Sequence, residues 1–202
     1  MECFGEAKSV CDEYEKFLFG GSGRVTKLSQ SDAEKKQPAP MAIFDSSLVA
    51  NCEMVYGNGT VDIEDCWLED LDGNHINVID SGMPFRWCYH VKFNQDVDSP
   101  IFAMLLKTRE GVAIFGTTSN KADISKNYFL AGEQLAVYFT LDNILAPGIY
   151  YFNCGVRIDT SNGMKFLSRR IDSGILRVTS SRQTTSESGI AEMRARLTIE
   201  KI

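Results

Sequence analysis

The chain lacks several features by which protein classes are recognised. It has only two histidines among 202 residues, and no apolar run comes near the roughly 18 residues that a membrane-spanning helix needs. Basic residues are outnumbered by acidic ones, 21 to 27, and the formal net charge is −6. General nucleic-acid binding, which relies on a basic surface, is therefore not expected. A local basic pocket for an anionic ligand stays compatible with this charge.

Motifs that would carry catalysis or hold a metal are missing too. The sequence contains no GxxxxGK[ST] phosphate loop, no GxSxG nucleophile motif and no EF-hand loop. His75 and His90 have no cysteine or glutamate at ligand spacing, so we expect neither a metal nor a cofactor. A catalytic triad or a pair of catalytic carboxylates assembles from distant positions, so an enzyme that acts on glycans stays an alternative.

The cysteines follow no pattern of a disulfide framework. Their spacings are wide, no CxxC motif occurs, and the six lie at positions 3, 11, 52, 66, 88 and 154. A chain of this length can bury a core without disulfides. Residues 1–4 have neither the basic nor the apolar region that opens a signal peptide. We therefore expect free thiols in a cytoplasmic protein.

Three segments follow one another along the chain. Residues 1–20 contain apolar side chains at helical spacing and predict a short helix, which Gly20 and Gly21 end. Residues 21–45 are rich in Gly, Ser, Pro and charge, and predict a flexible linker. Residues 46–202 predict a β domain. Its last strand, over 190–201, follows a polar connector at 180–189.

The β domain is predicted from alternating apolar and polar residues between turn signals. The expected strands span residues 47–56, 61–70, 83–94, 101–108, 113–117, 133–141, 148–159 and 166–179. Their number and spacing favour an all-β, antiparallel β-sandwich. Within 85–94, Trp87 has the same parity as Phe85, Tyr89 and Phe93, so we assign it to the core.

Aromatic rings alternate with amides and cations on the opposite faces of some strands. This combination suits a sugar, because ring faces pack on pyranose C–H groups while amides and cations bond hydroxyls. An ordinary solvent face with a few tyrosines is the other interpretation. For Trp67 either face of its strand could be the core. The candidate binding residues are Trp67, His90, Lys92, Tyr138, Tyr151, Asn153 and Arg157.

The order of several short motifs resembles a known family. The motifs are GTVDI at 59–63, LEDLDGN at 68–74, SPIFAMLLK at 99–107, GVAIFGTTS at 111–119, FLAGE at 129–133 and LAPGIYY at 145–151. Together they resemble the C-terminal domain of Wzt, the ATPase subunit of bacterial O-antigen polysaccharide ABC exporters, over about residues 47–180. Residues 5–14, GEAKSVCDEY, resemble the end of an ABC ATPase domain. The tail from residue 189 matches the family only loosely.

The resemblance implies an immunoglobulin-like sandwich that binds the exported O-antigen polysaccharide, often at its modified non-reducing end. It implies a homodimer with exchanged C-terminal strands, whose further partners are an ABC ATPase domain and a membrane transporter subunit. The location it implies is the cytoplasmic, inner face of the inner membrane. The ATPase motifs themselves are missing, so residues 1–20 would be a remnant of that domain and the chain no enzyme. A glycan-acting enzyme and a protein–protein assembly domain are the alternatives.

Overall fold

The computed structural model describes residues 41–119, 126–161, 163–180 and 189–191. These residues form only strands, turns and loops, and no helix occurs among them. The all-β prediction is therefore confirmed. The helix expected within residues 1–20 lies outside the described residues, as do residues 21–40 of the expected linker and 192–201 of the expected last strand.

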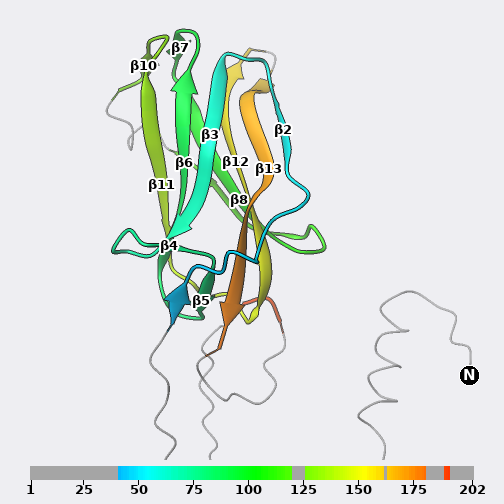
Figure 1. Ribbon diagram of the computed structural model, residues 1–202. Helices are drawn as coiled ribbons and strands as arrows, with labels where there is room; N and C mark the ends of the chain where they lie inside the picture. Colours follow the sequence, from blue (N-terminus) through cyan, green and yellow to red (C-terminus); the bar gives the residue numbers. More distant parts are fainter. Residues whose placement is uncertain (1–40, 120–125, 162, 181–188, 192–202) are drawn as a thin grey trace, which may run out of the picture. The chain divides into compact units, whose positions relative to one another are not determined.

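The strands lie in two layers, with a small two-stranded sheet beside them (Figure 1). The larger sheet has the order β1 (Ala42–Ile43), β5 (Val78–Asp80), β13 (Gly163–Thr179), β12 (Gly148–Thr160), β8 (Ile101–Thr108) and β9 (Ala113–Thr118), and β2 (Met54–Gly57) also pairs with β13. The second layer has the order β11 (Gln134–Leu141), β6 (Phe85–Phe93), β3 (Val61–Glu69) and β4 (His75–Ile76). The small sheet pairs β10 (Tyr128–Phe129) with β7 (Val97–Asp98). Every pairing is antiparallel except that of β13 with β5.

The prediction of a strand over residues 47–56 is wrong for most of that range. Only β2, at its end, is a strand, and Ala42–Ile43 in the expected linker forms β1 instead. Just before this range and at its start, the amide side chain of Asn77 bonds the backbone in place of a strand partner. Its oxygen accepts from the Asp45 amide at 2.7 Å, and its nitrogen donates to the carbonyls of Asp45 and Leu48 at 2.8 and 3.3 Å. Backbone groups satisfied in this way need no β-ladder.

The core lies between the two layers and is built on β6 and β12. Trp87 is 0% exposed, as predicted, and its ring stacks on Phe152 of β12 with centroids 4.9 Å apart. Gly174 of β13 leaves room for this ring, because a Cβ there would overlap the indole. Alternate residues of β6 and β12 form the centre of this core, and apolar side chains of β3, β8 and β13 complete it.

Two β-bulges face each other across the open edge of the sandwich. In β3, one extra residue lies between Ile63 and Cys66, relative to its partner β6. In β13, two extra residues lie between Arg170 and Gly174, relative to β12. The β13 bulge is also where that strand changes its outer partner from β2 to β5. Bulges bend a strand and re-aim its side chains, so these two shape the edge between the layers.

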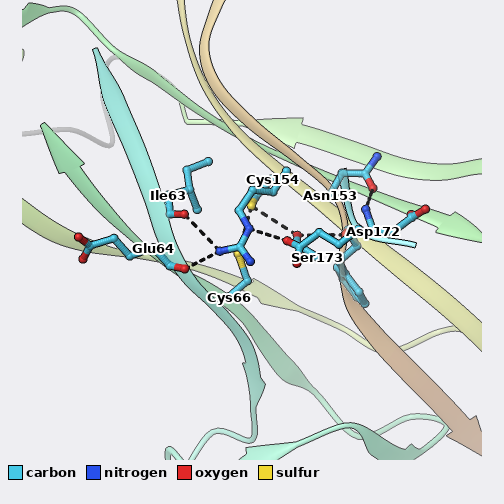
Figure 2. Close-up of polar contacts among 10 residues, drawn as sticks. Ile63, Glu64, Cys66, Asn153, Cys154, Asp172 and Ser173 are labelled. Carbon is cyan, nitrogen blue, oxygen red and sulfur yellow. Dashed lines mark hydrogen bonds and ion pairs between the residues drawn. The ribbon is translucent and has the colours of Figure 1, made fainter. Parts of the chain in front are cut away.

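Arg170 connects the two bulges. Its Nη1 donates to the carbonyl oxygens of Ile63 and Glu64 at 3.2 and 2.5 Å. Dashed lines at the labelled Ile63 and Glu64 in Figure 2 mark these two hydrogen bonds. Its Nε donates to the carboxylate of Glu53 at 2.5 Å. The Arg170 side chain is 16% exposed. A guanidinium in this position satisfies the carbonyls that the β3 bulge frees from the ladder.

Arg170→Met should lower the free energy of unfolding by about 2–4 kcal/mol, because hydrogen bonds to charged groups contribute about 1.5–3 kcal/mol each and two carbonyls lose their donor. Urea denaturation followed by tryptophan fluorescence measures the loss. Arg157→Met is the matched control, since Arg157 is 18% exposed and, within the described part of the chain, its ion pair is with Asp159, which is 64% exposed. An ion pair whose carboxylate is exposed to solvent contributes about 0–1 kcal/mol. Equal losses in the two variants would contradict the role assigned to Arg170.

Candidate functional site

The seven candidate residues divide between the two sheets. Trp67 on β3, His90 and Lys92 on β6, and Tyr138 on β11 share the four-stranded sheet. Tyr151, Asn153 and Arg157 belong to β12 in the seven-stranded sheet. The candidates therefore form two separate groups on opposite sides of the core. Periodicity gives the face of a strand but not the neighbours of that strand, so the sequence could not show this division.

The first group lies on the outer face of the four-stranded sheet. Trp67 and Tyr138 are both in register with Cys88 of β6, one from each side. His90 follows two residues along β6 and therefore points to the same face. Tyr138 is 53% exposed, while Trp67 is half-buried. Three neighbouring strands thus bring these rings together on one rigid surface.

Trp67 is the centre of an aromatic cluster of four rings. Its centroid lies 4.6 Å from that of His90 and 6.3 Å from that of Tyr138, which meets it edge-on at 88°. The imidazole of His75 stacks on the indole at 5.9 Å and 22°. We refer to Trp67, His75, His90 and Tyr138 as the Trp67 cluster. His75 is the member that sequence reasoning missed, because only the pairing of β4 with β3 brings its turn beside Trp67.

Hydrogen bonds fix the indole of Trp67. Its Nε1 donates to Glu69 Oε2 at 2.9 Å, and Arg86 Nη1 donates to Glu69 Oε1 at 2.8 Å. Burial works to raise the pKa of Glu69, but the hydrogen bonds from Trp67 and Arg86, together with the charge of Arg86, outweigh it and lower that pKa. The carboxylate thus remains ionised and holds the edge of the cluster in place.

A cleft of about 580 Å³ borders the cluster. It lies at the open edge of the sandwich, where Trp67, His75 and His90 meet residues 173–175 of β13 and the irregular segment before β2. Asp65, at the bulge of β3, also lines this cleft, and its carboxylate lies 3.3 Å from His90 Nδ1. The site therefore combines ring faces with a carboxylate, an imidazole and a phenol, which can bond hydroxyl groups of a ligand.

The second group of candidates has little free polar surface. Asn153 is only 4% exposed, and its side-chain oxygen accepts from the amide of Asp172 at 2.8 Å, so it holds the β13 bulge (Figure 2). Arg157 is paired with Asp159, and Tyr151 is half-buried. A smaller hollow of about 350 Å³ lies here, lined in part by Arg157, Gly155 and Gly116.

Within the described ranges, no group of three or more His, Cys, Asp or Glu side chains could hold a metal ion. In the same part of the chain, no helix has the length and apolar character needed to cross a membrane.

Comparisons with known proteins identify relatives of the chain. A family model described as the Wzt C-terminal domain matches residues 53–193. A solved structure titled "Crystal structure of the C-terminal domain of wzt" is similar with a TM-score of 0.64 and 24% identity, over 73% of this chain and 89% of that chain. A CARDB domain from Pyrococcus furiosus has a TM-score of 0.34 and 13% identity, over 62% of this chain and 99% of that chain. No curated protein matches.

The family match and the fold agree with the resemblance that the sequence motifs indicated. The match at residues 53–193 covers β2 to β13, including every strand that carries the Trp67 cluster. The Wzt C-terminal domain structure shares the fold. The chain therefore belongs to the Wzt C-terminal domain family.

Proposed function

We propose that this domain binds O-antigen polysaccharide without catalysis, at the modified non-reducing end of the glycan, and so selects it for export by an ABC transporter. The observation that carries the proposal is the Trp67 cluster, which exposes aromatic and polar groups together beside a cleft. Membership of the Wzt C-terminal domain family supports the same substrate class.

The chemistry of the cluster suits a sugar. The C–H face of a pyranose ring can pack on Tyr138 and the accessible part of Trp67, since aromatic rings contribute large apolar area with few rotatable bonds. The phenol, the imidazoles and Asp65 can then bond the hydroxyls at the rim of the sugar. Because strands and the Glu69 hydrogen bond already hold the rings, little side-chain entropy remains to be lost on binding.

The two alternatives make different demands on the same surface. A protein–protein assembly site is less favoured, because Lys92 lies on this face and protein interfaces deplete lysine at their centres. For an enzyme acting on glycans, the contact between Asp65 and His90 would be the candidate acid–base pair. Shortening of the polysaccharide during incubation with the domain would favour the enzyme over the binding module.

The assembly that we propose is a homodimer with exchanged C-terminal strands, attached to an ABC ATPase domain and a transporter subunit at the cytoplasmic face of the inner membrane. The backbone pairing of residues 190 and 191, at the start of the tail, supports the proposal that the tail is a strand. Ala146 donates its amide to the Ile190 carbonyl at 3.0 Å, and Ala191 forms an antiparallel bridge with Leu145. An apolar edge strand needs a partner, and a second copy of the chain can supply one.

Tyr138→Ala should weaken binding of the polysaccharide from the source strain about fivefold or more, because loss of a stacking ring typically costs about 1–3 kcal/mol. Calorimetric titration measures the affinity. The unfolding free energy should change by no more than about 0.5 kcal/mol, since the side chain is exposed. Trp67→Ala should weaken binding at least as much.

Tyr151→Ala is the matched control, with the same side chain removed from the outer side of the other sheet. It should leave the affinity within about twofold of wild type, a difference of about 0.4 kcal/mol. If Tyr151→Ala or Arg157→Ala weakens binding while Tyr138→Ala does not, the glycan site lies on the seven-stranded sheet instead.

Glu69 should make the stability of the domain depend on pH. Its pKa is lower in the folded state than its ordinary value of 4.5, so its carboxylate favours folding above that pH. This contribution is lost as the pH falls through the folded-state pKa. The free energy of unfolding of wild type should therefore exceed that of Glu69→Gln near neutral pH, and the difference should shrink below pH 4.5. A difference that stays constant in urea titrations across this range would contradict the prediction.

A further inference from the structure

Two thiols face each other across the sandwich at its open edge. Cys66 follows the bulge of β3, and Cys154 lies on β12 in the other sheet. Their Sγ atoms are 3.4 Å apart, and both cysteines are free (Figure 2). Both point into the space between the layers, because Cys66 is in register with the buried Tyr89 and Cys154 is itself buried. No role in glycan binding requires this pair.

We propose that Cys66 and Cys154 are a redox pair, which a small hydroperoxide such as hydrogen peroxide converts into a disulfide between the two sheets. The placement carries the proposal: the two sulfurs are already in contact, and they belong to strands of different layers. Cys66 and Cys154 are 88 residues apart in the sequence. A bond here would therefore close a long loop of the chain.

The reaction balances with one hydroperoxide and two thiols. The Cys66 thiolate attacks one peroxide oxygen, which breaks the O–O bond, releases hydroxide and leaves a sulfenic acid on Cys66. The Cys154 sulfur then attacks the Cys66 sulfur and displaces the sulfenic oxygen, which leaves as water with the thiol proton. In total, two thiols lose two electrons and two protons, and the peroxide becomes two water molecules. A dithiol reductant reverses the bond by exchange.

The surroundings of the two cysteines decide which one attacks the peroxide and which one resolves the sulfenic acid. The hydrogen bond from Cys154 lowers the pKa of Cys66, and the charge of Arg170 adds to this, against the effect of burial. Burial raises the pKa of Cys154 well above its ordinary value. Cys66 is thus the attacking thiolate and Cys154 the resolving thiol. Cys66 also lines the open cleft beside Trp67, which gives a small oxidant a path to it.

The other two described cysteines are poor competitors. Burial raises the pKa of Cys88 to about 12. Cys52 is exposed, but desolvation and the neighbouring carboxylate of Asp172 raise its pKa. Neither is in contact with a second thiol among the described residues. Among the four described cysteines, oxidation by limited peroxide should therefore select Cys66 first.

Peptide mapping of the wild-type chain tests the pairing. The protein is treated with a few equivalents of hydrogen peroxide, alkylated, and digested with a protease that cuts after Asp and Glu. This digestion separates Cys66, which follows Asp65, from Cys52, which precedes Glu53. We expect the main cross-linked species to join the Cys66 and Cys154 peptides, and dithiothreitol to release them. Cys66 linked chiefly to another cysteine, fully alkylated, or carried on to a sulfinic acid would overturn the proposal.

Thermal unfolding provides a second measurement. Because the bond would restrict the unfolded chain, the oxidised domain should unfold at a higher temperature than the reduced one. Cys154→Ser should abolish this shift, while Cys52→Ala, the matched control, should keep it. A shift that persists in Cys154→Ser would show that another oxidation product stabilises the domain, and would contradict the proposed pair. Both readouts are independent of the glycan proposal, because neither uses polysaccharide.

Discussion

The hydrogen bonds from Arg170 to the carbonyls of Ile63 and Glu64 hold together the edge of the sandwich on which the rest of the site depends. Arg170 belongs to one sheet and the two carbonyls to the other. Its guanidinium therefore joins the two layers at a place where β13 and β3 share no backbone hydrogen bonds as sheet partners. Without a donor, the freed carbonyls of the β3 bulge would be costly to bury. The cleft, the two facing thiols and the position of Trp67 all lie at this edge.

The bulge that Arg170 stabilises also decides which way Trp67 points. Val61 and Ile63 are buried, and strict alternation would bury residue 67 as well. The extra residue before Cys66 reverses the parity, so that Cys66 and Leu68 face the core and Trp67 faces outward. The one inserted residue therefore turns the Trp67 ring outward, to the proposed glycan site, and the Cys66 thiol inward, to the proposed redox pair.

The sequence predicted those parts of the fold that depend on local periodicity. It predicted the strand over 101–108 with its observed bounds, and the burial of Trp87. It did not predict the bulge of β3, which is why Trp67 had no assigned face. The strand expected over 47–56 does not begin where it was predicted. At the start of that range the Leu48 carbonyl accepts from a distant side chain, Asn77, and the Leu48 amide bonds the Asp45 carbonyl in a turn. The division of the candidate residues between two sheets depends on long-range strand pairing, which alternation does not encode.

The most direct test of the central claim uses the two tryptophans of the chain as paired probes. In a nitrogen-15 NMR spectrum, the indole N–H signals of Trp67 and Trp87 report on the outer face and on the core respectively. Addition of the polysaccharide from the source strain should shift the Trp67 indole signal in a saturable manner and leave that of Trp87 in place. Saturable binding with an unmoved Trp67 signal would contradict the account, because the glycan would then occupy another surface.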